Sequence, residues 1–357
     1  MKVIVVFGGG GSKGAFDYGV WSVLAPVLRS SGASLLAVGG TSMGAVNAAC
    51  LARHGQDLCA GAAMLESLWC EQLTMPSVPF AGPFGDRAHR SWNGVLTGLL
   101  LGNRSLYHST AMSWNPFASL QSTERPLMDR GPMWQWLDRE VGTHCAHSHG
   151  DPVLCIPAVD VLSGDLVLFD SANMPVAPEH LAASSAMPLL FEPVEIDGHL
   201  YWDGEMSRES MVPVMLDRLR DLGRLSDADD EEVMLITIDH MSRELPRPPQ
   251  SGLELVHRAL ELLLQGKMEV PDHALQGITH VLSIVRDPLD NDAISGQFDY
   301  SPERIQELIE LGQRQAERAC SGRWLDNARR PVVDTQPWMN PAAVQTDRNA
   351  GQSPGLH

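Results

Sequence analysis

The sequence predicts an α/β fold with a mostly parallel central sheet, and three observations predict it. A β-branched run at residues 3–7 ends in consecutive glycines, which is typical of a buried parallel strand. A second short apolar run, at residues 35–38, also ends in glycines. Helical patterns follow the two runs, at residues 14–29 and 44–54, and this alternation of strand and helix requires crossover connections.

The next segments belong to the same domain, which we expect to span residues 1–325 as a single unit. Asp57 can cap a helix over residues 57–73. Residues 75–125 then contain four prolines among scattered Trp and Leu side chains. Because such a stretch fits neither strand nor helix periodicity, we expect an insertion or cap there rather than core sheet.

Two hairpins are predicted in the middle of the chain from their turn residues. Strands at 152–159 and 166–169 flank Ser163-Gly164, and strands at 191–196 and 200–202 flank Asp197-Gly198. The other predicted elements are helices at 178–187, 212–222, 253–264 and 302–318 and strands at 233–238 and 280–285. Residues 331–357 are polar and contain Pro and Gly, so we expect a disordered tail.

Composition limits the partners and the compartment. The 357 residues carry a formal net charge of −18, which repels nucleic acid and opposes permanent adsorption to an anionic bilayer. The six cysteines show no paired spacing and are typical of free thiols in a reducing compartment. The apolar run at the N-terminus is too short for a signal peptide or a membrane span. We therefore expect a cytoplasmic protein, with signal-independent secretion left open.

A sharp turn is predicted where the second strand meets the next helix. It reads Gly40-Thr41-Ser42-Met43-Gly44 and matches G-x-S-x-G, the nucleophile elbow that lifts a serine hydroxyl out of the backbone. Side chains at Gly40 or Gly44 would clash at such a turn, and the N-terminus of the following helix favours negative charge near Ser42. The alternative interpretation is a plain glycine turn.

A glycine-rich loop follows the first strand and reads Gly8-Gly9-Gly10-Gly11-Ser12-Lys13-Gly14. Successive glycine N–H groups can converge on an anion, either a phosphate or the oxyanion of a tetrahedral intermediate. A phosphate-binding P-loop is excluded because a glycine, not Ser or Thr, follows Lys13.

Three interpretations of this loop stay open. Gly9, Gly11 and Gly14 fit the dinucleotide pattern G-x-G-x-x-G, but no Asp or Glu occurs between residues 20 and 50 to hold a ribose. A second interpretation is a purely structural glycine loop. We favour an oxyanion hole that serves Ser42, because the two motifs then explain one another.

The candidate base is a carboxylate. Asp203 follows a short strand and precedes Gly204, so we expect it on a loop at a strand end, where burial would raise its basicity. Its alternative is a turn Asp held by its own backbone. An ordinary α/β-hydrolase would use a late histidine, and His240 and His280 are candidates that we interpret as structural.

Taken together, these motifs resemble those of the patatin-like phospholipases. The loop from Gly9 through Gly10 and Gly11 to Lys13 and Gly14 is similar to the family's oxyanion loop. Gly40-Thr41-Ser42-Met43-Gly44 is similar to its nucleophile elbow, Asp203-Gly204 to its D-G-G/A motif, and residues 182–203 to the run that leads into it. The likeness covers roughly residues 1–215.

The resemblance implies a three-layer α/β/α fold and a lipid acyl hydrolase of the phospholipase A or esterase type. Ser42 would attack an ester carbonyl, Asp203 would take its proton and later activate water, and the amides of Gly9, Gly10 and Gly11 would hold the oxyanion. The family implies phospholipids or other acyl-ester lipids as substrates, transient membrane contact and no cofactor or metal. Residues 75–125 would then form an acyl-chain groove or lid, or else pack as ordinary core.

One residue departs from the family pattern. Glu205 stands where the D-G-G/A motif has Gly or Ala. A carboxylate there could crowd Asp203, raise its pKa, or strain the turn if the position needs a positive φ. The alternative function is therefore a weak or inactive patatin-like scaffold that binds lipid or protein. We discount metal binding by the His and Cys side chains at residues 144–149, because they lack the paired spacing of a zinc site.

Overall fold

The computed structural model describes residues 1–80, 86–110, 126–146, 148–226, 231–241, 244–245 and 247–321. Its main sheet has the strand order β11-β10-β1-β2-β6-β9-β8, with β7 paired to β6 off this path. The strands are β1 (Lys2–Phe7), β2 (Ser34–Gly40), β6 (Val153–Asp160), β7 (Leu166–Asp170), β8 (Val194–Ile196), β9 (His199–Asp203), β10 (Val233–Asp239) and β11 (His280–Val285). The predicted tail at residues 331–357 lies outside the described residues.

The sheet is parallel through its centre and antiparallel at one side. The neighbours β11, β10, β1, β2 and β6 pair in parallel, whereas β7 and β9 pair antiparallel with β6 and β8 with β9. Both predicted hairpins, β6-β7 and β8-β9, are confirmed. The predicted mostly parallel sheet is therefore confirmed, and the carboxyl ends of its parallel strands meet at one edge.

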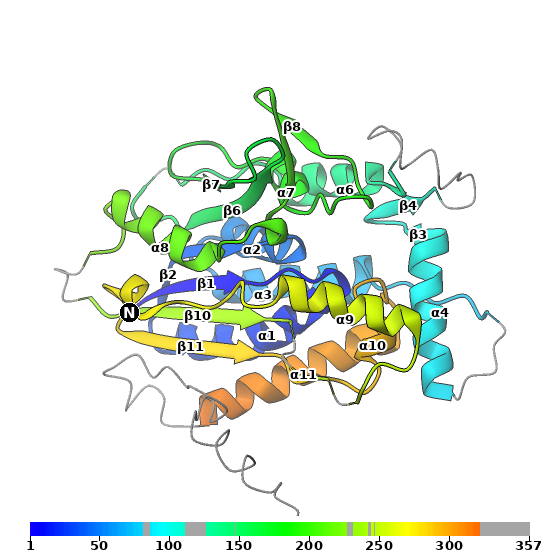
Figure 1. The fold of residues 1–357 in the computed structure, drawn as a ribbon. Coiled ribbons are helices and arrows are strands. Elements are labelled where there is room, and N and C mark those ends of the chain that lie inside the picture. The colour runs from blue at the N-terminus through cyan, green and yellow to red at the C-terminus, as the bar shows by residue number, and fades with distance from the viewer. Residues whose placement is uncertain are drawn as a thin grey trace, which may run out of the picture.

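Helices cover both faces of the sheet, because alternate side chains of each strand point to opposite sides. Val3, Val5 and Phe7 of β1 belong to the core on one face, and Ile4 and Val6 belong to the core on the other. The first face is covered by α1 (Ala15–Ser30), α2 (Met43–Arg53), α3 (Leu58–Glu66) and α11 (Pro302–Ser321). The second is covered by α8 (Met211–Asp221) and a short 3₁₀ helix at Asp272–Leu275. The predicted three layers are present (Figure 1).

Other elements gather beyond the carboxyl ends of the strands. Figure 1 shows α4 (Asp86–Leu101), α9 (Gly252–Leu264) and α10 (Asp292–Ser295) past the arrowheads of β1, β10 and β11. A separate small sheet contains β3 (Gly102–Asn103), β4 (Tyr107–Ser109) and β5 (Met128–Asp129). Residues 75–125 thus include a regular helix and two short strands outside the main sheet. None of the described helices has the length and apolarity needed to cross a lipid bilayer.

Two local predictions differ from the structure. The single helix expected over residues 57–73 is α3, capped by Asp57, followed by a π-helical turn at Ser67–Gln72. Side-chain periodicity does not separate these two forms, because both continue the same apolar stripe. The helices α6 (Gly131–Trp136) and α7 (Pro178–Ser184) lie on the side of the sheet that contains β6, β8 and β9, and only α7 was predicted.

Candidate active site

Ser42 occupies a strained turn between β2 and α2. Its φ of 56° and ψ of −125° are unusual for a residue with a side chain. A Cβ at Gly40 would lie 2.3 Å from the Gly44 carbonyl oxygen, and one at Gly44 would lie 2.4 Å from that of Gly8. The two glycines of the motif are therefore required by close backbone packing, as the sequence predicts. The Ser42 amide donates to the Ser184 carbonyl oxygen at 3.1 Å, which holds the turn against α7.

Sheet register brings Asp203 level with this serine. Gly39 of β2 pairs with Cys155 of β6, and three residues further along β6, Ala158 pairs with Asp203 of β9. Ser42 likewise lies three residues beyond Gly39. The strand β6 extends past the end of β2, and β9 pairs with this overhang, so the last residue of β9 faces the elbow.

The Asp203 carboxyl is fully buried and only partly satisfied. Its Oδ1 accepts the backbone N–H of Glu205 at 2.9 Å, while Oδ2 has no hydrogen bond of normal length and angle with any described residue. Burial raises its pKa to about 7, against opposing hydrogen bonds from the Glu205 amide and the Ser42 hydroxyl and the charge of Arg130. The Ser42 hydroxyl is therefore near enough to affect the pKa of this carboxyl, but it makes no hydrogen bond of normal length and angle with it. A loose contact of this kind is common in enzymes without substrate.

The glycine loop is fixed at both ends and open in the middle. Gly8 N–H donates to the Ile238 carbonyl at 2.9 Å, and Ser12 N–H donates to that of Gln297 at 3.0 Å. Between them, the amides of Gly10 and Gly11 make no hydrogen bond within the described part of the chain. These two N–H groups are free to bind an anion.

The amide of Gly9 is not free. It donates at 2.9 Å to Oε1 of Glu205, whose side chain is buried. The sequence did not predict this contact. The one observation that pointed to position 205 was a large charged residue where the family motif has Gly or Ala. Glu205 lies in a short 3₁₀ turn, and the described non-glycine residues with positive φ are Ser42, Leu189 and Asp197, so the strain considered for Glu205 does not occur. From the sequence we considered that Glu205 could raise the pKa of Asp203. In the structure the charge of Asp203 instead helps burial to raise the pKa of Glu205 to about 8.

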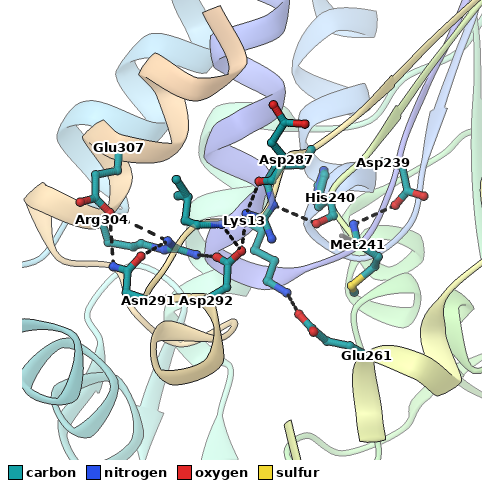
Figure 2. Close-up of polar contacts among 12 residues, drawn as sticks. Lys13, Asp239, His240, Met241, Glu261, Asp287, Asn291, Asp292, Arg304 and Glu307 are labelled. Carbon is teal, nitrogen blue, oxygen red and sulfur yellow. Dashed lines mark hydrogen bonds and ion pairs between the residues drawn. The ribbon is translucent and has the colours of Figure 1, made fainter. Parts of the chain in front are cut away.

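Lys13 belongs to a buried network of charged side chains. Its Nζ lies 2.5 Å from Oε1 of Glu261 on α9, and both side chains are buried (Figure 2). Burial lowers the pKa of Lys13, and the charge of Glu261 opposes this.

Gly14 is required by packing, because a Cβ there would lie 2.7 Å from the Trp69 ring. A Cβ at Gly204 would lie 2.8 Å from the Pro157 carbonyl oxygen.

Neither candidate histidine takes the place of Asp203. His280 begins β11, at the amino end of the parallel strands and therefore at the edge of the sheet opposite the elbow. His240 lies behind the glycine loop, where its Nε2 is 2.6 Å from Oδ1 of Asp17 and both side chains are fully buried. Among the described residues, no three His, Cys, Asp or Glu side chains are grouped so as to hold a metal ion.

One further cation was not singled out in the sequence. Arg130, at the start of α6, is buried and donates to the backbone carbonyls of Ala182 and Glu192 at 2.5 and 3.0 Å. Its guanidinium lies 4.9 Å from the Phe191 ring centroid, and its charge lowers the pKa of Asp203. Its position 73 residues before Asp203 in the chain gave no signal of this proximity.

Comparison with known proteins adds the family. The family model described as patatin-like phospholipase matches residues 5–216, which is more than half of the chain. The chain belongs to the patatin-like phospholipase family. The match includes the glycine loop, the elbow and Asp203. Among curated protein sequences, none matches this chain.

Three solved structures are similar to this chain at low sequence identity. VipD from Legionella pneumophila is 14% identical, with a TM-score of 0.41 over 89% of this chain and 66% of that chain. The ExoU-SpcU complex from the type III secretion system of Pseudomonas aeruginosa is 13% identical, with a TM-score of 0.35 over 90% of this chain and 52% of that chain. The type III effector protein ExoU is 14% identical, with a TM-score of 0.34 over 90% of this chain and 53% of that chain. The chain thus spans between about half and two thirds of these proteins.

Proposed function

We propose that the chain is a lipid acyl hydrolase that cleaves carboxylic esters through an acyl-enzyme on Ser42. Ser42 Oγ attacks the ester carbonyl, and its proton passes to Asp203. The carbonyl oxygen becomes an oxyanion held by the amides of Gly10 and Gly11, and the alcohol leaves as the carbonyl re-forms. In that step the protonated Asp203 gives its proton to the leaving oxygen, which restores the carboxylate. Asp203 then takes a proton from water, which attacks the acyl-enzyme, and returns it to Ser42 Oγ as the fatty acid leaves.

The single observation that carries this proposal is the state of the Asp203 carboxyl. It is buried, has one unpaired oxygen, interacts with the Ser42 hydroxyl and has a pKa raised to about 7. A general base works best when its pKa lies near the working pH, because it is then both ionised and able to take a proton. The described parts of residues 75–125 lie outside the main sheet, which supports a role for this segment in holding an acyl chain. We also propose that residues 1–325 form one domain.

The test is intact-mass labelling with a fluorophosphonate, which reacts with activated serines. The wild type should gain one adduct, Ser42→Ala none, and Asp203→Asn should react roughly 10²- to 10⁴-fold more slowly. The matched control is Ser163→Ala, in the turn between β6 and β7, which should label like the wild type. An adduct that persists in Ser42→Ala would contradict the assigned nucleophile. A lipid substrate series would then define headgroup and chain preference.

A second candidate function is a patatin-like scaffold with little activity. It is favoured by one observation, the Glu205 carboxyl bound to the Gly9 amide. Under this alternative the wild type would take no adduct, while its lipid or protein partner would bind equally well to wild type and Ser42→Ala.

A further inference from the structure

Glu205 places a carboxyl group against the backbone of the glycine loop. Its Oε1 accepts the Gly9 N–H at 2.9 Å across 196 residues of sequence. A Cβ at Gly9 would lie 2.8 Å from both Cγ and Oε1 of Glu205, so the side chain packs directly on the loop backbone. With 5% of its surface exposed, Glu205 has little freedom to turn towards solvent.

A carboxylate is the same kind of ligand as the oxyanion that the loop would hold during catalysis. Both are negatively charged oxygens that accept hydrogen bonds from convergent backbone N–H groups. Glu205 occupies the first of these amides, and the next two, Gly10 and Gly11, have no hydrogen bond within the described residues. A negative charge at Glu205 would therefore stand beside the place where negative charge develops in the reaction.

We propose that the Glu205 carboxyl is a built-in gate on the glycine loop, open to reaction at Ser42 when it is protonated and closed when it is ionised. The inference rests on the proposed function of Ser42 and Asp203. In the protonated form the carbonyl oxygen of the acid still accepts the Gly9 N–H, so the loop keeps its shape without adding charge. In the ionised form the carboxylate repels the oxyanion and weakens its binding to Gly10 and Gly11.

The groups around Glu205 favour the protonated form. Burial has the largest effect, and the carboxyls of Asp203 on β9 and of Asp239 at the end of β10 add to it. The Gly9 N–H and the ammonium group of Lys267, which follows α9, oppose it. Together they raise the pKa of Glu205 to about 8, compared with about 7 for Asp203.

These directions define a window of activity. As pH rises through about 7, Asp203 loses its proton first and becomes a base, while Glu205 keeps its proton. As pH rises further through about 8, Glu205 ionises and the gate closes. Because the two carboxyls interact, the two titration steps are properties of the pair rather than of either residue alone. After the step at lower pH, the remaining proton is on Glu205.

The experiment compares the pH dependence of fluorophosphonate labelling in wild type, Glu205→Gln and Glu205→Ala. Glutamine keeps a carbonyl that can accept the Gly9 N–H but cannot ionise, and alanine is the small residue of the family motif. Both variants should keep the rise near pH 7 and lose the alkaline fall. At pH 9 the wild type should react about tenfold more slowly than Glu205→Gln, since pH 9 is one unit above the pKa of Glu205. The matched control is Glu209→Gln, an exposed residue of the same loop, which should keep the alkaline fall.

A second readout does not depend on catalysis. The folded protein binds a proton at Glu205 that the unfolded chain releases near pH 4.5, so this residue makes the free energy of unfolding decrease as pH rises from about 4.5 to 8. Glu205→Gln should show a smaller decrease in chemical denaturation, whereas Glu209→Gln should follow the wild type.

The outcomes separate the two proposals. Equal alkaline behaviour of wild type and Glu205→Gln, in protein that still labels at Ser42, would overturn the gate and leave the proposed function intact. No adduct on wild type or on any Glu205 variant would overturn the proposed function and the gate with it. Labelling of Glu205→Gln that is slower than wild type at every pH would also overturn the gate, because glutamine can keep the Gly9 contact and carries no charge that opposes the oxyanion.

Discussion

At the level of single residues, the candidate site consists of two carboxyls with different partners. Oδ1 of Asp203 accepts the Glu205 amide, and its Oδ2 has no hydrogen-bond partner among the residues that the structure describes. Oε1 of Glu205 accepts the Gly9 amide. Both are buried, so water stabilises neither charge, and both pKa values rise. The carboxyl beside Ser42 loses its proton first, and this order is what a base at Ser42 requires.

Arg130 should set the pH at which the reaction begins. Its guanidinium charge favours the ionised form of Asp203, so replacing it by Gln should move the acid limb of the labelling rate from about pH 7 to higher pH. The measurement is the labelling rate from pH 5 to 9, with the exposed Arg139→Gln as control. An unchanged limb in Arg130→Gln would mean that the limb does not report Asp203. The variant should also lose stability, by roughly 1–3 kcal/mol, because two buried carbonyls lose their charged donor.

At the level of elements, the elbow depends on β1, β2 and α2 approaching more closely than side chains permit. Gly44, in the first turn of α2, packs on the carbonyl oxygens of Phe7 and Gly8 at the end of β1. The neighbouring Gly40 packs on Gly44. These contacts place the strained φ of Ser42 in a frame of backbone atoms that cannot move independently.

Gly44→Ala should therefore be strongly destabilising. Its Cβ would lie 2.4 to 2.6 Å from two backbone oxygens, and we expect a loss of roughly 3 kcal/mol or more in the free energy of unfolding. The matched control is Gly61→Ala in α3, where the nearest atoms lie at an ordinary 3.4 Å and a helical alanine should add roughly 0.5–1 kcal/mol. Denaturant titration of both variants gives the comparison. Equal stability of the two would contradict close packing at the elbow.

At the level of the whole molecule, buried polar contacts join the last third of the chain to the first. Asp17 of α1 pairs with His240 after β10, and the backbone carbonyl of His240 accepts Nε of Arg286 at 2.9 Å. Arg286 pairs with Asp292 of α10 at 2.8 Å. Asp292 in turn pairs with Arg304 of α11 at 2.5 Å (Figure 2). The family match ends at residue 216, and beyond it β10 pairs with β1 and β11 with β10, so the later described residues add two strands to the same sheet.

Asp292 pairs with both arginines of that network, so replacing it should lower the free energy of unfolding of the whole protein. Asp292→Asn leaves two buried guanidinium groups without their carboxylate, and we expect it to cost roughly 3–5 kcal/mol of stability. The exposed pair Glu310–Arg314 on α11 is the control, since Glu310→Gln should cost about 0–1 kcal/mol. Both arginines lower the pKa of Asp292 well below its ordinary value, so its contribution is present above about pH 4 and is lost as pH falls further. Thermal melts at pH 7 would measure both variants, and similar melting temperatures would argue against the role of the network.

The sequence by itself determined the elements that depend on neighbouring residues. The β-branched run of β1, the turn residues of the β6-β7 and β8-β9 hairpins and the cap at Asp57 all act within a few positions, so their patterns could be recognised without the fold. The glycine spacing around Ser42 predicted the elbow for the same reason. The family resemblance also came from short motifs, and residues 5–216 confirm it.

Only the tertiary structure decided which of these motifs meet. The extension of β6 beyond β2 sets Asp203 beside Ser42, and the turn after β9 carries Glu205 onto the Gly9 amide. The same folding buries Lys13 against Glu261, although its place in the motif suggested a role at the loop. Contacts between residues about 200 positions apart depend on strand register and on burial. Both arise only when the whole chain packs, because water and the local backbone satisfy each of these polar groups until then.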